Sequence, residues 1–199
     1  MTDVFFLSGW AGPAGLFPGL SDRMAFAAPF LDGDEAGLVS RAAASRARVL
    51  MGWSTGAHMI LKNAGTLLPL FDRVLLIAPF VQFADCFPAR ITNAMAAGMA
   101  RDAEGTVRAF WKNCAVPGHP AWDPAWAAPL AGGLGYLAAS AAPTAPVAAG
   151  HVTVLHGAAD RIVRASAVDK VLAVLPGARL VAVAGGHYPD AAALADGSA

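Results

Sequence analysis

The chain has 199 residues, of which 56% are hydrophobic, and its 14 basic and 14 acidic side chains cancel to a formal charge of zero. This balance gives no overall field that would attract nucleic acid or an anionic membrane, so we expect neither as a partner. No apolar stretch reaches the roughly 18 residues of a membrane-spanning helix, and the absence of Lys and Arg before Arg23 does not fit a secretory signal. We therefore expect one domain over residues 1–199 that is monomeric and cytoplasmic.

The chain contains two cysteines, Cys86 and Cys114. Two are too few for a disulfide framework, and their spacing is not that of a metal site. We expect both to be reduced and packed in the interior, and we expect no bound metal.

The first part of the chain alternates strand and helix signals. Residues 3–7 form an apolar run typical of a buried parallel strand, and a turn of small residues follows at 8–13. A second strand is expected within 23–31. Asp34 fits the N-cap of a helix that runs to about residue 47, although a glycine at position 37 weakens that helix.

The next strand, residues 48–51, runs into the sequence Gly-Trp-Ser-Thr-Gly at 52–56 and then a helix to about residue 64. A strand that turns sharply into a helix and exposes one side chain needs small residues on both sides, and Gly52 and Gly56 meet that need. Ser54 is therefore the candidate nucleophile. Its place at a helix N-terminus favours a negative charge that develops beside it.

A further apolar strand at 73–78 is followed by an insertion at about 85–150. Two helices are expected there, at about 91–97 and 104–114, ahead of a region rich in proline, tryptophan and alanine. The insertion is either a lid over a site or a helical excursion that packs for stability alone. Its aromatic and proline residues are Trp111, Pro117, Pro120, Trp122, Pro124, Trp126 and Pro129.

After the insertion, a strand at 151–156 leads to Asp160, and a helix is expected at 165–175. The last strand, 178–184, leads to His187. Alternation of apolar strands with helices predicts a parallel sheet that is covered on both faces.

Ser54, Asp160 and His187 each follow a predicted strand, and the carboxyl ends of such strands converge at one edge of a parallel sheet. Asp160 comes 106 residues after Ser54, and His187 comes 27 residues after Asp160. The order Ser, Asp, His is that of an α/β-hydrolase triad. We expect His187 to remove the Ser54 proton while Asp160 orients the imidazole.

Other titratable residues fit these roles less well. Asp169 lies in the middle of a predicted helix, and Asp190 follows the histidine. Packing or solvent exposure is the better interpretation of the remaining histidines, which are His58, His119, His151 and His156.

An oxyanion hole would need two backbone amides. The amide after the nucleophile belongs to Thr55, and the loop after the first strand offers that of Trp10. A purely structural role for the Trp10 ring stays open.

The motifs at 52–56, 157–163 and 186–187 resemble those of the α/β-hydrolase superfamily across nearly the whole chain. The resemblance implies a reduced, mainly parallel sheet of about six strands flanked by helices, with a short helical lid.

Within that superfamily, the chain is similar to the pimeloyl-acyl-carrier-protein methyl esterases of biotin synthesis. Their oxyanion loop reads His-Gly-Trp-Gly and their elbow Gly-Trp-Ser-x-Gly, against Ser-Gly-Trp-Ala at 8–11 and Gly-Trp-Ser-Thr-Gly at 52–56 here. Residues 78–110 are also similar. Ser8 stands where the family has histidine, and the lid is shorter. The resemblance implies substrate contacts at Trp10, Phe80 and Phe110, and carrier-protein docking at Arg101, Arg108 and Lys112.

The resemblance implies cleavage of the pimeloyl methyl ester by Ser54, with an acyl ester substrate on a carrier protein and no cofactor. A general carboxylesterase or thioesterase for short to medium acyl groups uses the same triad. A carrier-protein-binding domain without activity is a third reading, which the complete set of Ser, Asp, His and glycines disfavours.

Overall fold

The computed structural model describes residues 3–20, 23–118 and 120–189, so His119 and Asp190 lie outside the described residues. Six strands form one sheet in the order β2-β1-β3-β4-β5-β6, and every neighbouring pair is parallel. This confirms the predicted sheet. The strands are β1 (Val4–Leu7), β2 (Ala25–Ala27), β3 (Val49–Trp53), β4 (Arg73–Ile77), β5 (Val152–Gly157) and β6 (Arg179–Val183).

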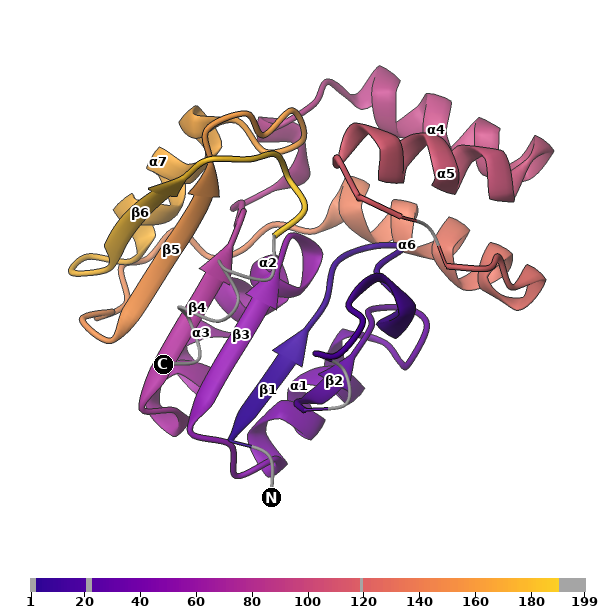
Figure 1. Cartoon of the computed structure of the whole chain (residues 1–199). Coiled ribbons are helices and arrows are strands. Elements are labelled where there is room, and N and C mark those ends of the chain that lie inside the picture. The colour runs from indigo at the N-terminus through magenta and orange to yellow at the C-terminus, as the bar shows by residue number, and fades with distance from the viewer. Residues whose placement is uncertain (1–2, 21–22, 119, 190–199) are drawn as a thin grey trace.

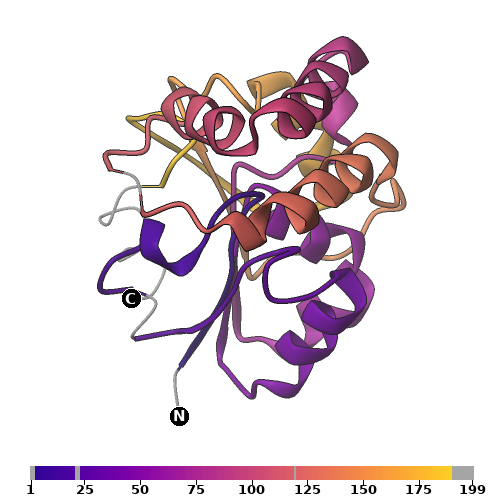
Figure 2. The same ribbon diagram turned by 90° about the vertical axis from the view of Figure 1, so that its right-hand side faces the viewer.

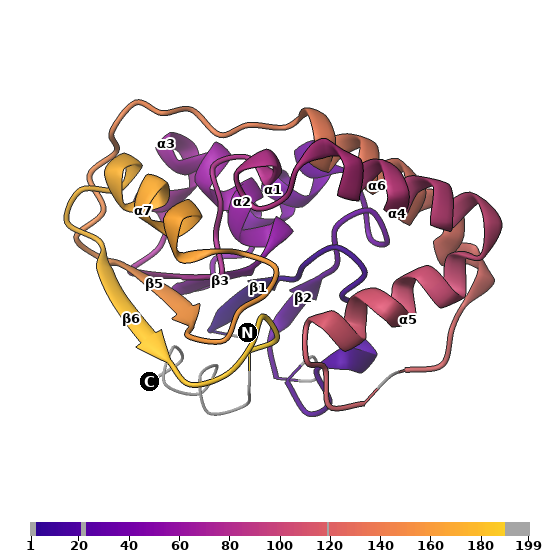
Figure 3. The same cartoon turned by 90° about the horizontal axis from the view of Figure 1, so that it is seen from above.

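One face of the sheet is covered by α1 (Glu35–Ala44), α2 (Thr55–Lys62), α3 (Ala64–Leu67) and α7 (Ala165–Val174), which lie along the same side of the strands in Figure 3. Asp34 caps α1 as predicted, because its side chain accepts a hydrogen bond of 2.9 Å from the amide of Gly37. β1 and β3 are buried along their whole length, as their continuous apolar sequences predict.

The opposite face has a different cover. Near β1 and β3 it carries the short 3₁₀ helix η1 (Ala14–Leu16) and an aromatic cluster. Phe17 packs edge-on against Phe6 and Trp53, and its ring stacks on that of Tyr188 with centroids 5.5 Å apart. Short 3₁₀ turns also occur as η2 (Leu68–Leu70), η3 (Phe83–Asp85) and η4 (Pro124–Trp126).

The α-helices of the insertion lie beyond the carboxyl ends of the strands (Figures 1 and 2). α4 (Ala89–Arg101) and α5 (Ala103–Asn113) lie where two helices were predicted. α6 (Ala127–Ala139) was not predicted, because its proline and three glycines are typical of a loop. Pro129 lies in the first turn, where an intrahelical amide bond is not required. Gly133 packs so closely on the Phe30 ring that an added Cβ would lie 2.5 Å from it.

None of the helices in the described part of the chain combines the length and apolar character needed to cross a membrane. Cys86 and Cys114 are both buried free thiols. Burial raises the pKa of the Cys86 thiol to about 12, so that it is protonated near neutral pH.

Candidate active site

Ser54 lies at a sharp turn between β3 and α2. Its φ of 54° and ψ of −113° place it in a region that residues other than glycine rarely adopt. The flanking glycines permit this turn. A Cβ on Gly52 would lie 2.8 Å from the backbone of Ala57, and one on Gly56 would lie 2.2 Å from the carbonyl oxygen of Leu7. The neighbouring backbone leaves no room for a side chain at either position, which explains the predicted need for glycine.

Three loops bring the predicted triad residues together. His187 Nε2 lies 2.9 Å from Ser54 Oγ, and His187 Nδ1 lies 2.9 Å from Asp160 Oδ2. An ionised carboxylate only accepts hydrogen bonds, so Nδ1 carries the proton and Nε2 is left to accept from the serine hydroxyl. This is the tautomer that a general base for Ser54 requires.

The Asp160 carboxylate is well stabilised in its ionised form. Burial alone raises its pKa, but the hydrogen bond and charge interaction with His187 and the amides of Val163 and Ile162 outweigh burial and lower it. Those two amides donate to Asp160 Oδ1 over 2.9 and 2.7 Å, while Oδ2 faces the imidazole. The Asp160 and His187 side chains are fully buried, so water does not weaken their interaction.

The loop after β1 adopts a tight turn beside Ser54. The Gly12 amide donates to the Gly9 carbonyl over 3.1 Å, and Ala11 has a φ of 52°. Ser8, which stands where the resembling family has histidine, donates its hydroxyl to the Gly12 carbonyl over 2.7 Å and so closes the loop. Trp10 is a central residue of this turn, and its amide donates to Thr55 Oγ1 over 3.3 Å. The two expected oxyanion residues are thus in contact.

Two indole groups fasten the helical insertion to this loop. Trp10 Nε1 donates to the Leu130 carbonyl of α6 over 2.9 Å, and Trp111 Nε1 of α5 donates to the Ala11 carbonyl over 2.6 Å. The insertion is therefore held against the loop beside Ser54, and in this region Ser54 is 5% and His187 1% exposed. The Trp10 ring also packs edge-on against Phe110, with centroids 4.9 Å apart.

A groove of about 690 Å³ runs between α4 and α5. Phe110 lies in its wall, and Ile162 connects the wall to the loop that carries Asp160. Arg101 also lines the groove. Of the other two docking candidates, Lys112 is exposed and Arg108 forms an ion pair of 2.7 Å with Glu104.

The structure places Phe80 elsewhere. Phe80 is 1% exposed, and its ring stacks on that of His58 with centroids 4.8 Å apart. His58 is a fully satisfied core histidine, as predicted, because its two ring nitrogens lie 3.0 Å from the Phe80 carbonyl and 2.9 Å from Ser140 Oγ. Phe80 therefore belongs to the core in this structure and is not among the residues that line the groove between α4 and α5. His151 and His156 likewise bond to backbone carbonyls.

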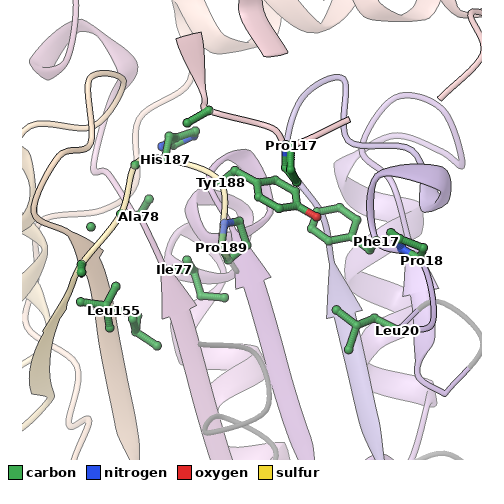
Figure 4. Close-up of a pocket in the computed structure, with 16 residues that line it drawn as sticks. Phe17, Pro18, Leu20, Ile77, Ala78, Pro117, Leu155, His187, Tyr188 and Pro189 are labelled. Carbon is green, nitrogen blue, oxygen red and sulfur yellow. The ribbon is translucent and has the colours of Figure 1, made fainter. Parts of the chain in front are cut away.

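Two aromatic residues that sequence reasoning missed hold the His187 loop in place. Trp53 Nε1 donates to the His187 carbonyl over 2.8 Å, and the Tyr188 hydroxyl donates to the Leu16 carbonyl. Figure 4 shows the Tyr188 ring beside Phe17 at the border of a cavity of about 480 Å³, with Pro117 above and Ile77 and Leu155 on its other side. Both residues are sequence neighbours of triad members, and this adjacency was the available signal.

Comparison of the sequence with protein-family models and with curated proteins gives no match. Solved structures do resemble the fold. An esterase from Exiguobacterium antarcticum superposes with a TM-score of 0.70 at 15% identity, over 94% of this chain and 85% of that one. The enol-lactonase from Burkholderia xenovorans gives 0.68 at 15% identity, over 100% and 89%. An alpha/beta fold family hydrolase from Bacillus anthracis gives 0.62 at 10% identity, over 95% and 87%.

At these identities the superpositions establish the architecture alone. The six-stranded parallel sheet with its flanking helices belongs to a chain that superposes on the lactonase and the Exiguobacterium esterase over 94–100% of its own length and 85–89% of theirs. The chain has the α/β-hydrolase fold.

Proposed function

We propose that this chain is a serine hydrolase that cleaves carboxylic esters. The observation that carries the proposal is the unbroken chain of hydrogen bonds from Ser54 Oγ through His187 to Asp160, each of 2.9 Å. A buried, ionised carboxylate that fixes the imidazole tautomer serves general base catalysis directly. The strained turn at Ser54 adds support, because backbone strain is concentrated at functional positions.

In the first half of the reaction, Ser54 Oγ attacks the ester carbonyl carbon as His187 Nε2 takes the hydroxyl proton. The carbonyl oxygen becomes an oxyanion, which the amides of Trp10 and Thr55 stabilise. The Thr55 amide suits this task because the first amides of a helix lack intrahelical partners. The intermediate then collapses, the bond to the leaving oxygen breaks, and His187 gives its proton to the departing alcohol.

In the second half, water attacks the acyl-serine. His187 takes a proton from the water, a second oxyanion forms in the same hole, and the bond from the carbonyl carbon to Ser54 Oγ breaks. The serine recovers its proton from His187, and the free carboxylic acid leaves. His187 carries every proton, Asp160 orients it, and the two amides stabilise both oxyanions, so the cycle needs no other group of the protein.

For the substrate, we propose an acyl ester, with the methyl ester of a carrier-bound pimeloyl chain as the specific candidate. The groove between α4 and α5 is apolar along Phe110 and Ile162, which suits a hydrocarbon chain. Arg101 lines that groove and Lys112 is exposed on α5, so both are available to an acidic carrier. The names of two structural neighbours, an esterase and an enol-lactonase, denote cleavage of ester bonds in those proteins.

The test compares a pimeloyl-carrier-protein methyl ester with a series of p-nitrophenyl esters, using wild type and Ser54→Ala. Faster Ser54-dependent cleavage of the carrier-bound ester would support the specific candidate. Turnover of only the free esters would leave a general carboxylesterase, and a preference for thioesters would point to a thioesterase. We expect the free energy of unfolding of Ser54→Ala to stay within about 1 kcal/mol of the wild-type value, because removal of the Ser54 hydroxyl opens no core cavity.

Labelling with a fluorophosphonate probe separates these enzymes from a non-catalytic binding domain. We expect folded wild type to be labelled at Ser54 and Ser54→Ala to stay unlabelled. Folded wild type that neither reacts with the probe nor hydrolyses any ester would overturn the proposed function.

A further inference from the structure

The hydroxyl of Thr55 occupies an unusual position beside the proposed oxyanion hole. Thr55 is 1% exposed and Trp10 is 2% exposed, and the contact between them is the 3.3 Å hydrogen bond from the Trp10 amide to Thr55 Oγ1. The amide that should stabilise the oxyanion is therefore directed at a side chain in the resting enzyme. This contact joins the two residues whose backbone amides form the hole.

A buried amide without an acceptor is destabilising, because it has lost its hydrogen bond to water and gained none in return. An oxyanion hole exists to bind a charge that is present only during the reaction, so in the resting enzyme its amides need another acceptor. Thr55 Oγ1 supplies one to Trp10 over a distance that makes a long hydrogen bond. A weak partner of this kind is readily exchanged for an oxyanion, because hydrogen bonds to charged acceptors are stronger.

A threonine hydroxyl both accepts and donates hydrogen bonds. Within the described residues, the structure gives the Thr55 hydroxyl proton no acceptor. Thr55 Oγ1 belongs to the first residue of α2, whose own amide is one donor of the hole, and it accepts a hydrogen bond from the Trp10 amide, which is the other. Its proton is therefore a third donor beside the two backbone donors.

We propose that the Thr55 side chain is a catalytic residue with two successive tasks. In the resting enzyme its oxygen accepts from the Trp10 amide and keeps the loop after β1 in place. When the tetrahedral intermediate forms, the Trp10 amide turns to the oxyanion, and the Thr55 hydroxyl donates its own proton to the same oxygen. No bond to hydrogen breaks in this exchange, because only hydrogen bonds are redistributed. This inference rests on the proposed ester hydrolysis and deepens it.

The decisive variants are Thr55→Val, which removes the hydroxyl at nearly constant volume, and Thr55→Ser, which keeps it. We expect Thr55→Val to lower kcat for a p-nitrophenyl ester by about a hundredfold, the usual loss for one oxyanion donor. KM should stay near its wild-type value, because the third hydrogen bond exists only in the transition state. Thr55→Ser should restore most of the activity. Thr66→Val, at an exposed position of α3, controls for the change from hydroxyl to methyl.

A second readout separates catalysis from mere support of the loop. An alkyl trifluoromethyl ketone adds to Ser54 and places an oxyanion in the hole. Thr55→Val should weaken its binding by about the same factor as it lowers kcat, as expected for a group that contacts the transition state. If Thr55→Val does not fold, Thr55→Ala is compared with Thr55→Ser in the same assays, after circular dichroism has confirmed that both are folded.

The outcomes are distinguishable. Wild type that hydrolyses esters and reacts with fluorophosphonate, beside a hydroxyl-free variant with unchanged kcat and unchanged ketone affinity, overturns the role of Thr55 alone. A hydroxyl-free variant that raises KM without lowering kcat also overturns the role of Thr55, because the side chain would then contribute to substrate binding and not to the transition state. Wild type without ester hydrolysis or labelling overturns the proposed function, and this inference with it.

Discussion

The edge of the sheet and the helical insertion contribute to the site by different means. At the edge, Ser54, Asp160 and His187 follow β3, β5 and β6, and backbone packing around Gly52 and Gly56 leaves the Ser54 turn little freedom. The insertion contacts the same region through side chains. The indole of Trp10 in the loop after β1 donates to α6, and the indole of Trp111 in α5 donates to that loop. The position of Ser54 therefore rests on backbone packing, whereas the attachment of the insertion rests on a few separable side-chain contacts.

The largest expected effect on activity comes from replacing Asp160, the acid of the triad at the edge of the sheet. In Asp160→Asn the amide can donate to the imidazole and favour the wrong tautomer, so kcat should fall by about 10⁴-fold with little change in KM. Steady-state hydrolysis of a p-nitrophenyl ester measures this. Asp169→Asn is the matched control, because Asp169 is exposed on α7. Equal rates for the two variants would remove Asp160 from the mechanism.

A methyl group at Gly56 tests how tightly the backbone is packed. A Cβ there would lie 2.2 Å from the Leu7 carbonyl and 2.3 Å from that of Ser8, so we expect Gly56→Ala to lower the free energy of unfolding by about 3 kcal/mol. Urea denaturation measures the loss. Gly65→Ala in α3 meets no atom within 4 Å and should be neutral or stabilising. A neutral Gly56→Ala would show that the elbow tolerates movement.

Loosening the insertion should have a smaller effect. Trp111→Phe removes the donor to the buried Ala11 carbonyl, and we expect a loss of about 2 kcal/mol in the free energy of unfolding and faster amide hydrogen exchange in α5. Trp122→Phe, in a half-buried pair with Trp126, serves as the control. Unchanged exchange in α5 would mean that other contacts hold the insertion closed.

The smallest change concerns the dependence of stability on pH. The folded-state pKa of Asp160 is lowered, so its contribution to stability is present above the ordinary carboxyl range and is lost as the pH falls through the folded pKa. Unfolding measured between about pH 3 and pH 7 should therefore show a smaller acid-side loss in Asp160→Asn than in wild type. Equal slopes would contradict the stabilised carboxylate.

Sequence patterns were informative where backbone geometry restricts the choice of residue. The glycines at 52 and 56 marked the elbow because their missing Cβ atoms leave room for neighbouring backbone, and apolar runs marked the strands because both faces are buried. The alternation of strands and helices then predicted that Ser54, Asp160 and His187 lie at one edge of the sheet. These signals are local, so they can be read without the fold.

Contacts across the insertion could not be predicted in this way. The bond from Trp111 to Ala11 joins residues 100 positions apart, and an indole donor can pair with any exposed carbonyl. α6 was missed because its proline and glycines are typical of a loop, and the close packing of Gly133 on Phe30 appears only once the partner is in place. The family resemblance implied a substrate contact for Phe80, but its ring stacks on that of His58 in the core.

The backbone conformation of Ser54 bears on how the nucleophile would be lost if selection for activity ceased. Holding a non-glycine residue in a sparsely populated conformation costs about 1–3 kcal/mol, and at 54° the φ of Ser54 is one that glycine adopts without strain. Mutational drift under selection for persistence alone would thus favour glycine over the nucleophile. We expect an inactive descendant to keep Gly52 and Gly56 and to carry a third glycine at position 54.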